Sequence, residues 1–405
     1  MAEPYSGAVL VMISYEIDVG YAIGRLIPVF HQACVDLCGS SDNVHFSFGR
    51  VGGRSCPNLP DGFDNILEFD YRNPDAAALQ CFAEYVRRNR IQTVLGLDLP
   101  VTAGFLPVAR AAGVRNIIAY WGAPMSSLNA GLKLLAKRLE VRLLRRARPD
   151  LFVFESEAMR RMATDGRGVP ATQTAVVHTG VDAQRFRPMP ECRNILHERF
   201  GIPRERRIIV YMGHLHERKG VAVLMRAMDH VVNSRGRRDI HAVFLGNRNA
   251  EENGFRDVWS PAESFITFGG YQSDVPELLT GSHAGCIPST GWDSFPMSSL
   301  EIQACGVPVI VSDWQGVPET VKDGETGIVT RTGDPAALAD AIIELIDDPA
   351  RRERMGRAAR ERIEAAFTVS HQVSNLLALL RARFGPASYV DSTTWRRRSP
   401  RSSVT

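Results

Sequence analysis

The chain has 405 residues, of which 44% are hydrophobic and 23% charged, a composition typical of a globular protein with more than one domain. Its 48 basic and 45 acidic residues nearly balance, and a formal net charge of +3 excludes the strongly basic surface of a general nucleic-acid binder. Seven scattered cysteines without a C-x-x-C pair argue against a zinc site or a disulfide framework and favour a reduced, cytoplasmic setting. Without a leader-like N-terminus or a run of about 18 apolar residues, we expect neither export nor a membrane span.

Short β-branched segments alternate with amphipathic helical segments along the first half of the chain. Strands are expected at residues 8–15, 43–49, 91–98, 114–121, 150–156 and 174–180, and helices at 21–38 and 102–113. Because these strand segments are apolar throughout rather than at alternate positions, they are typical of parallel strands covered on both faces. The first half therefore predicts a Rossmann-like α/β domain.

The same pattern starts again after residue 190. Strands are expected at residues 206–213, 240–247, 265–270, 283–289, 307–313 and 326–330, and long helices at 220–236, 335–348, 350–367 and 370–384. The fold class predicted is α/β, with two doubly wound parallel-sheet domains. We expect an N-terminal domain over 1–188, a C-terminal domain over 189–368, a last helix over 369–387 that packs back on the first domain, and a disordered basic tail over 388–405.

A cluster of cations follows the strand at 206–213. The stretch "YMGHLHERKGVAVL" places Gly213, His214, Arg218 and Lys219 between that strand and the next helix. Cations in the first turn of a helix have the wrong sign for its dipole, unless a bound anion lies there. Ligands of open parallel sheets bind at the carboxyl ends of the strands. The loop therefore predicts an anion site, and the alternative is a solvated first turn.

The stretch "DSFPMSSLE" follows a later strand and leads into a short helix. It contains Asp293, Glu301 and, between them, Ser294, Phe295, Pro296, Met297 and Ser298. Amides 297–299 at the helix start can face a phosphate, and the two carboxylates can accept hydrogen bonds from sugar hydroxyls. The alternative is structural: Ser298 and Glu301 match an S-x-x-E capping box.

Four further positions lie at or after strand ends and carry weaker signals. Gly20 lets the backbone approach a ligand after the first strand, and the alternative is an ordinary turn. Tyr271 follows the strand at 265–270, where a nucleobase could stack, and a core tyrosine is the alternative. Asp98 and Trp121 end two strands of the first domain and are candidate acceptor contacts, with plain packing the alternative for Trp121.

Phosphate held by amides and a lysine, together with diols held by acids, points to a nucleotide sugar. The blocks "AVVHTGVDAQRFRP", "GHLHERKG" and "DSFPMSSLEIQACGVPVIVSDWQGVPETVKDGETGIV" resemble the successive motifs of the retaining GT-B glycosyltransferases of family four, the glycosyl transferases group 1. The resemblance runs in order from about residue 176 to residue 367. The first half of the chain matches that family only in its layout.

The resemblance implies roles for particular residues. It assigns Glu301 to the ribose of the donor, Asp293 to the transferred sugar and Lys219 to the diphosphate, with the Gly20 loop closing over that diphosphate. It implies no cofactor and no metal in the transfer step, in agreement with the absence of a D-x-D pair from the chain. The sequence departs from the family where Asp293 replaces a glutamate and where His214 replaces an arginine, for which Arg218 is a substitute.

A third departure follows the strand at 114–121. Many family members have a histidine there, whereas this chain reads "AYWGAPMSS". The departing diphosphate is thought to assist deprotonation of the acceptor in this family, so a missing base is compatible with activity.

The segment 130–148 is basic and amphipathic. Its leucines 132, 135, 139 and 143 form one stripe, and lysines and arginines cover much of the remaining surface. One interpretation is a helix that covers a sheet with a solvated basic face. The other is weak peripheral contact with an anionic membrane.

The sequence thus predicts a retaining, metal-independent hexosyl-type glycosyltransferase. It would use a nucleoside-diphosphate sugar of undetermined base and a small-molecule, lipid or polysaccharide-precursor acceptor. The alternatives are a nucleotide-sugar 2-epimerase of the same fold and a non-catalytic bilobed binding protein for sugar nucleotides.

Overall fold

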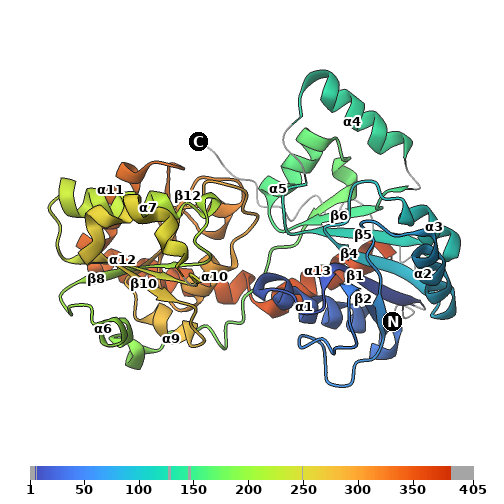
Figure 1. Ribbon diagram of the computed structural model, residues 1–405, viewed down its shortest axis with the longest axis horizontal. Helices are drawn as coiled ribbons and strands as arrows, with labels where there is room; N and C mark the ends of the chain where they lie inside the picture. Colours follow the sequence, from blue (N-terminus) through green and yellow to red (C-terminus); the bar gives the residue numbers. More distant parts are fainter. Residues whose placement is uncertain (1–4, 6, 126–128, 145–146, 249, 385–405) are drawn as a thin grey trace. The chain divides into compact units, whose positions relative to one another are not determined.

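The computed structural model describes residue 5 and residues 7–125, 129–144, 147–248 and 250–384 (Figure 1). The chain divides into two compact units. The first contains the described residues up to Ala119, those of Leu144–Asp150 and those from Val373 onward, and the second contains Tyr120–Leu143 and Leu151–Gln372. The predicted domain boundary near residue 188 falls inside the second unit and stays a prediction, and the predicted basic tail lies outside the described residues.

The first sheet has seven strands in the order β3-β2-β1-β4-β5-β6-β7. Their bounds are β1 Ala8–Glu16, β2 Val44–Arg50, β3 Ile66–Glu68, β4 Ile91–Leu97, β5 Asn116–Trp121, β6 Leu151–Phe154 and β7 Thr174–Val176. The pairs β1–β2, β1–β4, β2–β3 and β6–β7 are parallel. The sequential order reverses between β1 and β4, which is where ligands bind in open sheets of this kind.

Helices accompany these strands in the chain, and the periodicity predicted those near residues 21–38, 102–113, 130–148 and 370–384 but not the two at 76–88 and 157–161. They are α1 Tyr21–Cys38, α2 Ala76–Arg88, α3 Phe105–Ala112, α4 Gly131–Leu143, α5 Glu157–Arg161 and α13 Val369–Phe384. Figure 1 shows α13 beside α1, and Arg381 of α13 donates a hydrogen bond to the Asp36 carbonyl of α1 at 2.9 Å. Leu376, Leu379 and Leu380 are buried, so this last helix presents an apolar face to the protein.

The second sheet has six strands in the order β10-β9-β8-β11-β12-β13, all parallel to their neighbours. Their bounds are β8 Arg207–Met212, β9 Ile240–Leu245, β10 Ile266–Gly270, β11 Ala284–Ile287, β12 Val309–Ser312 and β13 Gly327–Thr330. Here the order reverses between β8 and β11. The loops after these two strands, which carry the predicted anion site and the stretch "DSFPMSSLE", therefore meet at one edge of the sheet.

Helices and short turns complete the second half. The helices are α6 Ile195–Phe200, α7 Val221–Asp229, α8 Arg256–Trp259, α9 Val275–Thr280, α10 Met297–Ala304, α11 Pro335–Asp347 and α12 Pro349–Ala366. Local chemistry explains the sharp start of α11, because the Asp334 side chain caps the Ala337 amide and Pro335 needs no intrahelical hydrogen bond. Two clusters of buried side chains, one including Leu224 and Ile342 and the other Leu300 and Val309, form the core.

The structure confirms the predicted fold class, two parallel α/β sheets of the Rossmann type. Among the described residues, no helix has the length and apolar character needed to cross a membrane. All seven cysteines carry free thiols, and Cys34 and Cys286 are buried.

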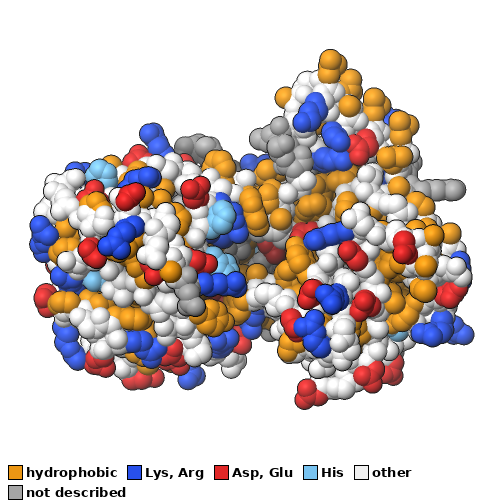
Figure 2. All heavy atoms as spheres, in the orientation of Figure 1, with side chains coloured by type: hydrophobic (Ala, Val, Ile, Leu, Met, Phe, Trp, Pro, Cys, Tyr) orange, Lys and Arg blue, Asp and Glu red, His pale blue; other side chains and the backbone are white. Residues whose placement is uncertain are grey.

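The segment 130–148 was interpreted as a helix whose leucine stripe covers a sheet. That interpretation is wrong, because the leucines are exposed. Leu132, Leu135, Leu139 and Leu143 are 85%, 53%, 49% and 76% exposed. The side of α4 turned toward the protein instead carries Val141, which is 1% exposed. Figure 2 shows orange and blue side chains lying together over α4, at the upper right of the view.

Candidate active site

The loops after β8 and β11 bring a lysine and an acid into contact. Lys219 Nζ lies 2.7 Å from Asp293 Oδ2, and Ser289 Oγ donates to the same oxygen at 2.7 Å. Asp293 is only 5% exposed, whereas the Lys219 side chain is 24% exposed. The site therefore holds a buried carboxylate, neutralised by an ammonium group that solvent still reaches.

Backbone contacts hold the two loops against each other. The amides of Thr290 and Gly291 donate to the Arg218 carbonyl at 2.9 and 2.7 Å. A Cβ atom at Gly291 would lie 2.3 Å from Arg218 Cβ, and one at Gly220 would lie 1.7 Å from the Pro288 carbonyl oxygen. Glycine is required at both positions because the backbones of the two loops approach so closely. Gly220 also has a φ of 69°.

The remaining residues of the first loop make contacts of their own. Arg218 stacks its guanidinium on Trp292, 3.9 Å from the ring centroid, and donates to the Trp292 carbonyl at 3.1 Å. His214 is exposed, and its carbonyl accepts a hydrogen bond from Tyr211 at 2.8 Å. Burial, followed by the nearby charge of Asp293, raises the pKa of Tyr211 far above its usual range. Gly213 follows β8 directly, with a φ of 152°.

The capping-box interpretation of Glu301 is wrong in this structure. The helix α10 begins at Met297, its N-terminal flanking residue is Pro296, and no side chain caps it, so Ser298 lies inside the first turn. Glu301 is 2% exposed. One predicted detail changes: the Ser299 amide donates to the Pro296 carbonyl at 3.1 Å, so of the amides 297–299 only the first two remain candidates for a phosphate.

Two predicted donor-binding residues have different surroundings. Phe295 is 2% exposed and packs on His178 and Phe367, with ring centroids 4.8 and 5.7 Å away, so it is a core residue that anchors the loop. Tyr271 is 79% exposed, which rules out the core alternative and leaves its ring open for stacking.

Sequence reasoning missed an acid at the end of β6. Glu155 is 7% exposed, and its Oε2 accepts a hydrogen bond from Ser294 Oγ at 2.6 Å. Tyr120, the penultimate residue of β5, donates to Glu155 Oε1 at 3.4 Å. Burial and the charge of Glu155 hold the pKa of Tyr120 well above its usual value, so the hydroxyl remains a donor. An acid directly after a buried strand was a signal that could have identified Glu155.

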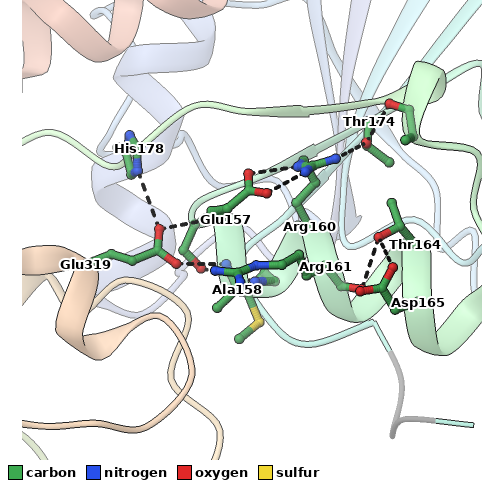
Figure 3. Close-up of polar contacts among 12 residues, drawn as sticks. Glu157, Ala158, Arg160, Arg161, Thr164, Asp165, Thr174, His178 and Glu319 are labelled. Atoms are coloured by element: carbon green, nitrogen blue, oxygen red, sulfur yellow. Dashed lines mark hydrogen bonds and ion pairs between the residues drawn. The ribbon is translucent and has the colours of Figure 1, made fainter. Parts of the chain in front are cut away.

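A second missed acid lies in the short turn Val317–Thr320 after β12. Figure 3 shows the Glu319 carboxylate at the start of α5, where it accepts hydrogen bonds from the amides of Glu157 and Ala158 at 2.8 and 2.7 Å. His178 Nε2 lies 3.8 Å from Glu319 Oε2. Burial alone would raise the pKa of Glu319, but His178 and the two amides lower it below its usual value. Glu319 thus remains charged and fixes this turn in place.

The remaining predicted residues lie at or after strand ends of the first sheet. Gly20 precedes α1 with an ordinary φ of −64°, and a Cβ atom there would meet nothing within 4 Å, so neither conformation nor space demands glycine. Asp98 follows β4 with a left-handed φ of 52°. Trp121 ends β5, and its indole Nε1 is buried without a hydrogen-bond partner among the described residues.

Comparisons with known sequences bear on this site. The model of the family "glycosyl transferases group 1" matches residues 193–362. A GDP-mannose-dependent alpha-(1-6)-phosphatidylinositol monomannoside mannosyltransferase of Mycolicibacterium smegmatis is 30% identical over 264 residues, 63% of this chain and 67% of that protein. A D-inositol 3-phosphate glycosyltransferase of Catenulispora acidiphila is 30% identical over 227 residues, 53% of each chain. The chain spans about half the length of several curated relatives that it matches.

Solved structures share the architecture. Anabaena HepE in complex with UDP superimposes with a TM-score of 0.75 at 18% identity, over 93% of this chain and 100% of that one. A glycosyltransferase from Rickettsia africae gives a TM-score of 0.77 at 15% identity, over 93% and 99%. At these identities the likeness shows the fold, which is GT-B. With the sequence matches, it follows that the chain belongs to the glycosyl transferases group 1, which is family four of the GT-B glycosyltransferases.

Proposed function

We propose that this protein transfers a hexosyl group from a nucleoside-diphosphate sugar to a small-molecule or lipid acceptor, with retention of the anomeric configuration and without a divalent metal. The observation that carries the proposal is the Lys219–Asp293 pair at the switch point of the second sheet. A solvent-accessible ammonium beside a buried carboxylate offers one group for an anionic phosphate and another for sugar hydroxyls.

The geometry suggests how these groups act. A bound diphosphate competes with Asp293 for Lys219, and the ammonium then neutralises the charge that grows as the bond between sugar and phosphate breaks. Asp293, still held by Ser289, accepts hydrogen bonds from the sugar instead. Glu301 accepts hydrogen bonds from the ribose, and the first amides of α10 face a phosphate. In these roles the protein side chains hold the donor, and the departing diphosphate itself assists deprotonation of the acceptor.

Two bases are the first candidates for the donor. The mannosyltransferase relative is named as GDP-mannose-dependent, and the Anabaena structure contains UDP. A thermal-shift screen of UDP, GDP, ADP and dTDP tests the proposal, since a ligand at a hundred times its dissociation constant stabilises the folded protein by about 2.7 kcal/mol. Selective stabilisation by one nucleoside diphosphate supports the proposal and identifies the base. Stabilisation by none would contradict it.

A second assay, with the nucleotide sugar that the screen selects, distinguishes transfer from the alternative 2-epimerase activity. With the matching nucleotide sugar and no acceptor, a transferase releases nucleoside diphosphate slowly by hydrolysis, and an epimerase changes the sugar without a net fall in nucleotide sugar. Proton NMR of the anomeric region separates these outcomes. We expect release of nucleoside diphosphate.

We also propose that the reaction takes place in the cytoplasm.

The exposed leucines of α4 support a lipid surface as a partner. Leu132, Leu135, Leu139 and Leu143 project from a helix whose Lys133, Arg138 and Arg142 are also exposed. Apolar side chains flanked by cations match the boundary of an anionic phospholipid bilayer, where the leucines enter the acyl region and the cations meet the head groups. Docking through α4 would bring the enzyme to lipid acceptors. The relatives named for phosphatidylinositol derivatives make such acceptors candidates here.

Vesicle sedimentation of the full-length protein tests this partner. The protein should bind vesicles that contain about 30% phosphatidylglycerol. Binding should weaken in 0.5 M salt and should be lost in the variant Leu135→Ser/Leu139→Ser. The control Arg204→Ser/Arg235→Ser removes two exposed cations of the second unit and leaves binding intact. Equal sedimentation of the leucine variant and the parent would exclude α4 as the docking surface.

A further inference from the structure

The turn after β12 contains a non-glycine residue in the left-handed backbone region. Gln315 has a φ of 48°. Non-glycine residues adopt this conformation uncommonly, and asparagine or aspartate does so more readily than glutamine. Such positions persist only where the surroundings enforce them, and they cluster at functional sites. The contacts of the Gln315 side chain are therefore informative.

Gln315 holds the backbone of the acid that lies beside Lys219. Its Oε1 accepts a hydrogen bond from the Asp293 amide at 3.0 Å. The next residue, Gly316, donates its amide to the Asp293 carbonyl at 3.4 Å. A Cβ atom at Gly316 would lie 1.6 Å from the Ser294 carbonyl oxygen, so the turn is packed directly on the backbone of residues 293 and 294.

The turn itself is anchored at both ends. Before it, Asp313 Oδ1 accepts hydrogen bonds from the amide and the hydroxyl of Thr332 at 2.7 and 2.5 Å. After it, Glu319 accepts the two amides at the start of α5. A group held between two such anchors can fix the position of its partner, because little of its own backbone is free to move.

A second contact holds the same loop at the next residue. Ser294 Oγ donates to the buried Glu155 carboxylate at 2.6 Å, while Gln315 and Gly316 hold residue 293. The Asp293 side chain then projects from a backbone that is held at residue 293 itself and at the residue that follows it. Because this backbone is held in place, Asp293 Oδ2 stays within hydrogen-bond distance of Lys219 and Ser289.

We propose that Gln315 is a positioning residue for Asp293, with Glu155 as its support at Ser294. The inference rests on the proposed function in that Asp293 binds the transferred sugar. Displacement of a reacting group by about 1 Å lowers turnover on the order of a hundredfold, even when the donor still binds. Loss of the Gln315 contact should therefore lower kcat more than it raises the KM for the donor.

Replacement of Gln315 by glycine tests the inference, because glycine relieves the left-handed strain and removes the hydrogen bond to Asp293. The matched control is Arg90→Gly, which relieves a similar φ of 51° at an exposed position of the first unit. Both variants should melt at or above the temperature of the parent. Only Gln315→Gly should lose kcat, by about tenfold or more, and only it should show faster hydrogen exchange in a peptide covering 292–296.

A structural role for Gln315 predicts a different result. If Gln315→Gly matches Arg90→Gly in kcat and in exchange over 292–296, the positioning role is overturned. If the parent transfers no sugar from any donor, the proposed function fails, and the exchange measurement still decides whether Gln315 holds this segment. Glu155→Gln keeps the size of the side chain but weakens the acceptor of the Ser294 hydrogen bond. This variant should also lower kcat more than it raises the KM for the donor. An unchanged kcat would exclude Glu155 as the support.

Discussion

Replacement of Lys219 by alanine leaves the buried Asp293 carboxylate without its counter-ion. Two unit charges 2.7 Å apart attract each other by about 6 kcal/mol at an effective dielectric constant of 20, before the cost of removing them from water. Loss of one partner of a buried pair costs about 3–5 kcal/mol. The Lys219 side chain is 24% exposed and Ser289 still donates to the same oxygen, so we expect a loss of about 2 kcal/mol.

Two assays separate stability from catalysis in this variant. A loss of about 2 kcal/mol lowers the melting temperature by roughly 4–8 °C for a unit of this size. Steady-state transfer should show kcat reduced about a hundredfold, or about 3 kcal/mol of transition-state stabilisation, with a smaller change in KM. Lys219→Arg should recover only part of the rate, because a planar guanidinium does not replace a compact ammonium.

The double variant Lys219→Ala/Asp293→Asn is the control for the charge argument. An amide in place of the carboxylate needs no counter-ion, so the melting temperature should return to within a few degrees of the parent while activity stays low. If the double variant melts as low as Lys219→Ala, the loss does not come from an uncompensated charge. If Lys219→Ala changes KM alone, Lys219 only holds the donor, and the stabilising group must be sought at Arg218, His214 or the first amides of α10.

Three further predictions concern Glu301, metal and pH. Glu301→Gln should melt near the parent but lose turnover on the order of a hundredfold, and equal turnover would return Glu301 to a structural role. Transfer should persist in excess EDTA, and a loss that manganese restores would contradict the metal-independent mechanism. Burial holds the pKa of His241 at about 4 and that of His283 at about 3. In both rings Nδ1 accepts a hydrogen bond, from Arg206 or from the Ile208 amide, so a second proton breaks a contact. Because both folded pKa values lie below the unfolded value of about 6.5, stability present above pH 6.5 is lost as pH falls toward 4, at up to about 1.4 kcal/mol per unit for each histidine. His241→Gln should flatten this slope in urea melts between pH 7 and 5, and an unchanged slope would refute the assignment.

The periodicity of the sequence was sufficient to predict most of the fold. The runs at 206–213, 240–247 and 307–313 appear as β8, β9 and β12 with ends displaced by one or two residues, because continuous apolar segments between turn signals have few other uses. The strand β3 at Ile66–Glu68 was not predicted, since three residues at a sheet edge carry no pattern. The expected helix 220–236 ends earlier as α7, followed by a π-helical turn at His230–Ser234, which periodicity does not distinguish.

The candidate site was predicted in part. Local motifs located Lys219 and Asp293 in their loops, and the rule for parallel sheets predicted a ligand site at the strand ends from which such loops leave. The contact of Glu155 with Ser294 joins residues 139 positions apart, and no local pattern encodes such a pair. The left-handed backbone of Gln315 was equally hidden, because sequence signals for that conformation are glycine and asparagine. For Ser298 the local signal was misleading: the capping-box pattern is present, but the helix begins at Met297, and Pro296 occupies the flanking position predicted for Ser298.

The most direct test of the central claim is the anomeric configuration of the product. The purified protein is incubated in excess EDTA with the nucleotide sugar that the thermal-shift screen selects and a set of polyol, phosphorylated inositol and phosphatidylinositol acceptors, and proton NMR follows the anomeric signals. The account predicts a new glycoside with the configuration of the donor, together with one equivalent of nucleoside diphosphate, and neither in Lys219→Ala on the same time scale. An inverted glycoside, or an epimerised sugar without release of nucleoside diphosphate, would contradict it.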